Sequence, residues 1–336
     1  MSEGINVLSV FDGMRCGYMA LDRLNVKVNN YFSSEIDKWA NAAGRVVNPD
    51  AVELGDVRGI SGWMLPPIDL FIGGSPCQGF SFAGKQLNFE DPRSKLFFEY
   101  VRILGELKKI NPDIKFMLEN VRMKKEFIDI ISEHLGVEPI AINSNLVSAQ
   151  NRYRLYWTNI QGVEQPKDKG IFLKDIVHEG EVSEEYTVPF DKTLQILDKE
   201  VERGKVGYFR KDSQANRVYY IHGKAVTLCG DAGGGAAKMG QYLFGCITPD
   251  RINKRQNGQR FSEGKKFYTL TAQDRHGVLI EGYIRKLTPI ECGRLQTIDD
   301  QVIVDILASG VSKTQVYKML GNGWTVDAVA HIFNKL

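Results

Sequence analysis

The segment INVLSVFDGMRCGYMALDRL, residues 5–24, predicts the unit from which the fold is built. Residues 5–10 form a short apolar run rich in branched side chains, which is typical of a buried strand. The run ends before Asp12 and Gly13, and apolar positions then recur at helical spacing from Cys16 to Leu24. A strand that passes through a glycine-containing turn into a helix predicts a βαβ unit, with the turn at the carboxyl end of the sheet.

The same alternation of patterns continues to about residue 160. It predicts an α/β protein with a doubly wound, Rossmann-like and mostly parallel sheet. Further strand patterns occupy 28–35, 68–74, 114–120 and 154–160, and helix patterns occupy 37–47, 94–110 and 124–136.

The character of the chain changes after residue 161, where glycines and charges increase and no clear period persists. Helix patterning returns at 283–296 and lasts to the C-terminus. We therefore expect a first domain part at 1–161, a smaller β-rich insert at 162–284, and a returning part at 285–336. Two similar segments, 224–235 and 266–277, share a Lys followed by Thr-Leu and a glycine-ended turn, and are either two hairpins of the insert, the interpretation we favour, or a coincidence.

Composition excludes several classes of protein. With 43% hydrophobic and 25% charged residues, the chain is typical of a globular protein, and no apolar run reaches the ~20 residues of a membrane span. The N-terminus lacks a signal-peptide pattern. The five cysteines are scattered, without a Cys-x-x-Cys pair, so we expect no disulfide framework, no metal site and a cytoplasmic location. The net charge of +2 does not decide whether nucleic acid binds, and the basic run 251–260 is either a phosphate track or a solvated loop.

The stretch GGSPCQGFS, residues 73–81, places a single thiol, Cys77, just after the apolar run IDLFI. Structural cysteines are usually buried among apolar neighbours, whereas a loop leaving a sheet is where reactive groups are displayed. Cys77 is therefore a candidate nucleophile.

Five charged residues lie on or just after other predicted strands. Glu35 and Asp56 are either ordinary loop acids or the acids of an adenosine pocket, since a carboxylate after the second strand commonly holds ribose hydroxyls. Glu119, in MLENV, ends an apolar strand, where burying an acid without a partner is expensive. Arg152 and Arg154, in QNRYRLYW, share a face if both lie on a strand; otherwise they are solvated surface residues.

Taken together, these motifs resemble those of the cytosine-5 DNA methyltransferases. VFDGMRCG, GGSPCQGFS, LENV, QNRYR and KMLGNGWTVD occur in the order of that family, and residues 84–99 resemble its mobile active-site loop. The FDG, GDVR and GNGWTV segments are also similar to those of mammalian de novo and prophage-type enzymes. The resemblance covers residues 5–160 and 285–330. It implies a methyltransferase domain that uses S-adenosylmethionine and a target-recognition domain at 162–284.

The resemblance also implies a role for each catalytic candidate. Cys77 is expected to add to carbon 6 of a cytosine, which allows carbon 5 to take the methyl group and leaves S-adenosylhomocysteine. Glu119 is expected to contact ring nitrogen 3 and the exocyclic amine, and Arg154 to hold the base carbonyl. Arg152 is a candidate for the positive charge that a reactive thiol requires.

For the methyl donor, the resemblance implies contacts from both ends of the chain: Phe11, Asp12, Gly13, Gly17, Glu35, Ile36, Asp56, Val57, Pro76, Asn322 and Trp324. The expected partner is double-stranded DNA, bound by a monomer in a bacterial or phage-infected cell, with or without a companion restriction enzyme. The expected phosphate or base contacts come from Gln78, Ser81, Lys85, Arg93, Arg251 and Arg255. Further candidate base readers are Arg217, Lys224, Lys238, Arg260 and Arg275.

Two other functions remain open at this point. An RNA cytosine methyltransferase of the same superfamily shares most of these motifs, but its tRNA branch lacks a full-sized recognition domain. A catalytically inactive relative could act as a regulatory binding module, although Cys77, Glu119 and the donor motif are all present.

Overall fold

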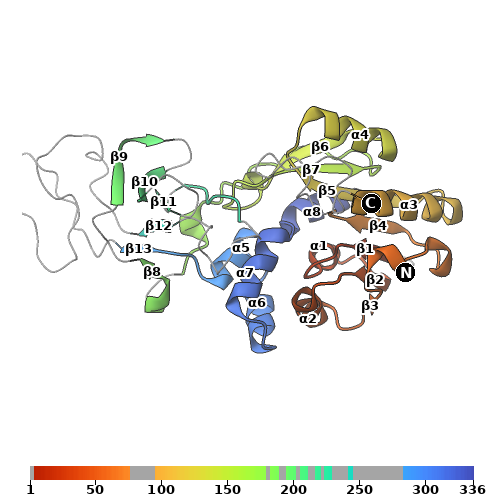
Figure 1. Ribbon diagram of the computed structural model, residues 1–336, viewed down its shortest axis with the longest axis horizontal. Coiled ribbons are helices and arrows are strands. Elements are labelled where there is room, and N and C mark those ends of the chain that lie inside the picture. The colour runs from red at the N-terminus through yellow and green to blue at the C-terminus, as the bar shows by residue number, and fades with distance from the viewer. Residues whose placement is uncertain are drawn as a thin grey trace, which may run out of the picture.

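The computed structural model describes residues 4–75, 95–178, 182–188, 194–201, 205–210, 216–220, 223–228, 241–244 and 283–336. They form two sheets with helices around the larger one (Figure 1). In these ranges no helix is both long and apolar enough to cross a membrane.

The larger sheet confirms the doubly wound α/β prediction. Its strand order is β3-β2-β1-β4-β5-β7-β6, and the pairs from β3 to β5 are all parallel. β7 runs antiparallel to both β5 and β6, so the sheet is mixed. The strands are β1 (Ile5–Val10), β2 (Val28–Ser34), β3 (Val52–Glu53), β4 (Leu70–Gly73), β5 (Lys115–Val121), β6 (Pro139–Asn143) and β7 (Tyr153–Thr158).

Both faces of this sheet are covered because successive strand residues point to opposite sides. In β4, Leu70 and Ile72 belong to one core cluster and Phe71 to the other. The first cluster includes residues of α1 (Cys16–Arg23), α2 (Lys38–Val47), α5 (Pro289–Leu295), α6 (Asp300–Ala308), α7 (Lys313–Asn322) and α8 (Val326–Phe333). The second includes α3 (Lys95–Ile110) and α4 (Lys125–Leu135). Residues from the C-terminal end of the chain thus complete the core built by the N-terminal half.

The smaller sheet has the order β8-β13-β12-β11-β10-β9. Its pairs are antiparallel except for β11 with β12. In Figure 1 it lies on the far side of α5 and α7 from the larger sheet. Its strands are β8 (Thr187–Val188), β9 (Leu194–Val201), β10 (Lys205–Phe209), β11 (Arg217–Tyr220), β12 (Gln241–Phe244) and β13 (Tyr283–Arg285).

Parts of the expected insert also pack with the larger sheet. Leu173 and Ile176 belong to the first core cluster, and so does Leu228. Ala225 pairs with Gln150 in a parallel bridge, and residues 229–235 of the first predicted hairpin lie outside the described residues. The second predicted hairpin, 266–277, lies outside the described residues. The domain limits expected at 161/162 and 284/285 stay predictions.

The predicted helix at 283–296 is wrong at its beginning, because residues 283–285 are strand β13. Helix α5 starts only at Pro289, after a capping box in which Thr288 and Glu291 bond each other's backbone. A proline at the first helical position disfavours helix in the residue before it. The capping box and Pro289 therefore set the start of the helix, although the apolar residues before Thr288 have helix-like spacing.

A fully buried ion pair joins β13 to α5. Arg285 donates to both carboxylate oxygens of Glu291, at 2.7 and 2.6 Å, and neither side chain is exposed. The same carboxylate accepts the backbone N–H groups of Thr288 and His178, each at 2.8 Å. Although burial raises the pKa of Glu291, the hydrogen bonds from Arg285 hold it below its usual value. The junction between the two sheets therefore contains a buried ion pair, and removal of either partner would leave the other charge buried without a counter-charge.

We expect Glu291→Gln to lower the free energy of unfolding by about 3–5 kcal/mol, because it leaves the Arg285 charge buried without an anion. The double variant Arg285→Met/Glu291→Gln keeps an acceptor for the backbone N–H groups and buries no charge. It should be more stable than Glu291→Gln alone in urea unfolding. A double variant less stable than the single one would contradict this account.

Candidate active site

The buried carboxylate of Asp12 holds the turn after β1 in place. Asp12 accepts hydrogen bonds from the hydroxyls of Ser9 (2.5 Å), Tyr31 (2.9 Å) and Ser33 (2.6 Å). Burial raises the pKa of Asp12 to about 6, although these hydroxyls and Arg15 act in the opposite direction. The bonds tie the turn to β1 and β2.

Next to Asp12 the backbone turns sharply and leaves open space beside Gly13. Phe11 and Gly13 both have positive φ, 56° and 58°, and a Cβ placed on Gly13 would meet no atom within 4 Å. The Gly13 N–H donates to Glu35 at 2.9 Å, and Glu35 also accepts from the N–H groups of Ile36 (2.7 Å) and Asp37 (2.8 Å). A carboxylate offers about four acceptor positions. Glu35 is thus fixed at the end of β2 with one position left for a ligand hydroxyl.

The neighbouring strand ends add apolar and acidic groups. Ile36 is 74% exposed, although it is a large aliphatic residue. Val57 is buried, at the start of the short helix η1 (Val57–Gly59). Asp56 caps this helix, and hydrogen bonds from Arg58 lower its pKa to about 2. Because β1, β2 and β3 are parallel neighbours, these predicted donor-site residues lie along one edge of the sheet.

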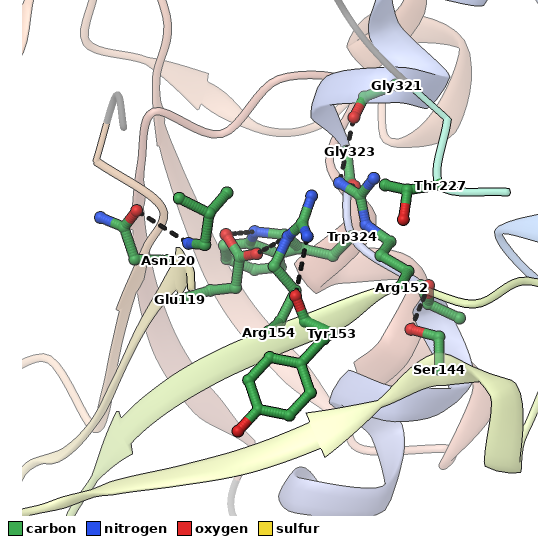
Figure 2. A network of polar contacts seen from close by, with 12 residues as sticks. Glu119, Asn120, Ser144, Arg152, Tyr153, Arg154, Thr227, Gly321, Gly323 and Trp324 are labelled. Carbon is green, nitrogen blue, oxygen red and sulfur yellow. Dashed lines mark hydrogen bonds and ion pairs between the residues drawn. The ribbon is translucent and has the colours of Figure 1, made fainter. Parts of the chain in front are cut away.

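A second buried carboxylate, that of Glu119, lies at the end of β5, and the residue is 8% exposed. One of its oxygens is 2.8 Å from Nε of Arg154, and the other accepts the indole N–H of Trp324 at 3.1 Å (Figure 2). Arg154 reaches Glu119 because β7 runs antiparallel to β5, with Arg154 opposite Val121. Glu119 is therefore buried with two donors, as its position after an apolar strand required.

Arg152 and Arg154 do not share a face, because Arg152 precedes the start of β7. Its guanidinium, in a residue only 2% exposed, donates to the carbonyls of Leu228 (3.1 Å), Gly321 (3.0 Å) and Gly323 (2.8 Å). Gly321 and Gly323 belong to the segment 321–325, the end of α7 and the residues before α8, which we call the C-terminal loop. Figure 2 shows Arg152 turned toward this loop and Arg154 turned toward Glu119. Neither arginine is the solvated surface residue of the alternative interpretation.

The C-terminal loop is fixed by further buried polar groups that the sequence did not reveal. Ser144 donates to the Thr325 hydroxyl, which donates to the Gln296 amide oxygen, both at 2.8 Å. Gln296 in turn donates to the carbonyl of Leu320. Within this loop Trp324 is 7% exposed, whereas Asn322 is exposed.

Asn120 is a second residue that sequence reasoning missed, although it stands beside Glu119 in MLENV. Its amide donates to the hydroxyl of Ser75 at 3.2 Å, and both residues are buried. A polar side chain next to the acid at the end of an apolar strand was the available signal. The contact fixes the chain at Ser75.

Several predicted residues lie outside the described ranges: Pro76, Cys77, Gln78, Ser81, Lys85, Arg93, Lys238, Arg251, Arg255, Arg260 and Arg275. Lys224, a predicted base reader, lies in a described segment. Its ammonium donates to the carbonyls of Asn145 (2.9 Å), Ser148 (3.2 Å) and Ile171, and burial lowers its pKa. Lys224 thus serves the packing of residues 223–228. Among the described residues, no group of three or more His, Cys, Asp or Glu could hold a metal ion.

Comparison with known proteins gives one consistent match. Residues 5–336 match the family described as C-5 cytosine-specific DNA methylase. The orphan methyltransferase M.SPRI of Bacillus phage SPR is 29% identical, over 99% of this chain and 97% of the relative. The type II methyltransferase M.HhaI of Haemophilus parahaemolyticus is 27% identical, over 98% and 93%.

Solved structures share the fold. The Entamoeba histolytica methyltransferase EhMeth aligns with a TM-score of 0.70 at 18% identity, covering 99% of this chain and 98% of the other. A DNMT2 mutant of Spodoptera frugiperda aligns with a TM-score of 0.65 at 16% identity, covering 99% of both chains.

The buried Asp12 predicts a pH dependence of stability. Since its pKa is raised from 3.8 to about 6, the folded protein holds this proton more tightly than the unfolded chain. Its contribution to the free energy of unfolding is therefore largest below about pH 4 and is lost as the pH rises through about 6. We expect the stability of the wild type relative to Asp12→Asn to fall by up to about 3 kcal/mol between about pH 4 and about pH 7. Urea unfolding of both proteins across this range measures the difference, and a constant difference would show that Asp12 has no raised pKa.

Proposed function

The chain belongs to the C-5 cytosine-specific DNA methylase family, and we propose that this DNA cytosine-5-methyltransferase acts through a covalent Cys77 adduct on a flipped cytosine within a specific short sequence. The observation that best supports this is the Glu119 carboxylate, held by Arg154 and Trp324. A Cβ on Gly74, three residues before Cys77, would lie 3.2 Å from the Glu119 oxygen. The segment that carries the thiol therefore begins against the acid.

The edge of β1 to β3 fits S-adenosylmethionine, which supplies an electrophilic methyl group. Glu35 retains one acceptor position for a ribose hydroxyl, and the open space over Gly13 admits the ligand next to the backbone. The exposed Ile36 offers an apolar surface for the adenine. We assign the adenine edge to Asp56 and Val57, and the closing contacts to Phe11, Pro76, Asn322 and Trp324.

In the proposed reaction, the Cys77 thiolate forms a bond to carbon 6 of the cytosine, and the ring electrons make carbon 5 nucleophilic. Glu119 contacts ring nitrogen 3 and the exocyclic amine, and favours protonation of the ring as the adduct forms. After carbon 5 has taken the methyl group, a base removes the proton on carbon 5, the double bond re-forms and Cys77 leaves.

Arg152 takes a supporting role in this scheme. Its guanidinium donates to three carbonyl oxygens, so we assign it to holding the C-terminal loop, and Arg154 to Glu119 and the base carbonyl.

Access to a cytosine inside a duplex requires the base to leave the stack. We propose that Gln78 fills the gap and that Ser81, Lys85 and Arg93 bind phosphates, which position the enzyme without reading sequence. Sequence reading is assigned to the insert, with Arg251 and Arg255 on the backbone of the DNA. The phage and bacterial relatives support action on DNA in a bacterial or phage-infected cell, where we propose that the protein acts as a monomer.

Cys77→Ser tests the nucleophile. A hydroxyl is far less acidic than a thiol, so transfer of labelled methyl to duplex DNA should fall by more than about 10²-fold, with donor affinity nearly unchanged. A 5-fluorocytosine duplex should trap the wild type covalently, because fluorine cannot be removed as a proton, and should not trap the variant. An RNA of the same sequence serves as the substrate control. Methyl transfer by Cys77→Ser within about tenfold of the wild type would rule Cys77 out as the nucleophile.

The basic run of the insert gives a separate test. Replacing Arg251, Lys254 and Arg255 with alanine should weaken binding to all duplexes, whatever their sequence. The slope of log affinity against log salt should become shallower by about 2–3, since each phosphate contact contributes about 0.9. A matched control replaces three exposed lysines outside the insert, Lys124, Lys125 and Lys335, and should leave the slope unchanged. Equal slopes for the basic-run variant and the wild type would show that this run does not contact phosphates.

A further inference from the structure

Trp324 is predicted to line the methyl-donor site, and a residue with that role alone would not need its hydrogen bond to Glu119. An indole N–H can only donate, and here it donates to a carboxylate oxygen at 3.1 Å within a buried site. The other oxygen of Glu119 is 2.8 Å from Nε of Arg154. Both oxygens therefore have a protein donor before any base arrives.

Two donors on different oxygens control the plane of the carboxylate. The terminal torsion of a glutamate is broad and has no steep minimum, so a single bond from Arg154 holds one oxygen and lets the other turn. A second bond from Trp324 fixes the position of both oxygens. Figure 2 shows the two donors converging on the carboxylate from β7 and from the C-terminal loop.

Packing around the indole leaves little freedom. A Cβ on Gly74 would lie 3.0 Å from Nε1 of Trp324, and a Cβ on Gly17 would lie 3.4 Å from Cζ3 of its ring. Gly17 lies in α1, just after the turn that contains Gly13, and Gly74 directly follows β4. The ring therefore lies beside both α1 and the residue that follows β4. A Cβ on Gly74 would crowd it, whereas a Cβ on Gly17 would be in ordinary contact with it.

The backbone that carries the ring is fixed as well. Arg152 binds the Gly321 and Gly323 carbonyls on one side of the loop, and Thr325 is bonded to Gln296 and Ser144 on the other. The indole N–H is thus aimed at Glu119 by the polar network of the C-terminal loop.

We propose that Trp324 is a positioning residue for the reaction, whose indole N–H orients the Glu119 carboxylate toward the cytosine and couples it to the wall of the donor site. This rests on the proposed function of Glu119. Misplacing a reacting group by about 1 Å can cost about 10²-fold in rate, so the effect appears in the chemical step.

The test compares Trp324→Phe with a matched variant, Trp157→Phe. Trp157 is a buried residue of β7 whose indole N–H donates to Ser132 at 3.0 Å, away from the site. Trp324→Phe keeps an aromatic ring and loses the indole N–H that donates to Glu119. We expect kcat to fall by about 10- to 10²-fold with donor affinity changed less than about threefold, and Trp157→Phe to keep kcat within about threefold.

A double-mutant cycle separates positioning from a general structural effect. In a Glu119→Gln background, which should itself lose about 10²–10⁴-fold in turnover, Trp324→Phe should have almost no further effect. The same loss in both backgrounds would overturn the proposal, because Trp324 would then act independently of Glu119.

If Trp324→Phe fails to fold, Gly74→Ala provides a second variant, since its methyl group would lie 3.0 Å from Nε1 and 3.2 Å from the Glu119 oxygen and would crowd the bond between them. It should reproduce the loss of kcat, and wild-type turnover would overturn the proposal. Failure of the proposed function would look different, because wild-type protein would then transfer no methyl to DNA and form no trapped adduct.

Discussion

The buried guanidinium of Arg152 is the contact on which the assembly of the site depends. A charge out of water is costly unless acceptors surround it, and here the acceptors are backbone carbonyls of Leu228, Gly321 and Gly323. They come from the insert, the end of α7 and the loop before α8. One side chain beside β7 therefore holds two distant parts of the chain against the larger sheet. If the loop that carries Trp324 moved away, the Arg152 charge would stay buried without its acceptors.

A consequence is that the N-terminal half does not contain a complete site. The donor turn and Glu119 both lie in it, but their shared wall is Trp324, between Gly17 and Gly74. Residues 285–336 are thus part of the same catalytic unit as β1 to β7. The insert is also less separate than its position in the sequence indicates, because Lys224 and Ala225 bind the segment 145–151. Residues 223–228 are therefore attached to the segment 145–151 through short contacts to its backbone.

The sequence predicted the parts of this structure that depend on local pattern. The apolar runs of β1, β4 and β5 and the amphipathic α3 were found because their periodicity is set by burial. The direction of β7, the edge strand β6 with its initial Pro139, and the bridge at Ala225 were not, since each depends on partners far along the chain. The acids Glu35 and Glu119 were identified from their positions after strands. The different partners of Arg152 and Arg154 were missed, because a shift of strand start by one residue decides which way a side chain points.

The two buried carboxylates of the site differ in their partners, and this difference fits the different roles proposed for them. Asp12 is surrounded by three neutral hydroxyls, and its nearest cation, Arg15, is 4.0 Å away and also bound to Glu53 and to the Gly44 carbonyl. Its charge is poorly compensated, which suits a group that braces a strained turn and takes no part in chemistry. Glu119 instead has a guanidinium at 2.8 Å and an indole donor, so its charge is compensated and its plane is fixed. In the role proposed for Glu119, one oxygen accepts from the exocyclic amine of the cytosine and the other faces ring nitrogen 3, so the plane of the carboxyl group has to be fixed, and Arg154 and Trp324 provide this.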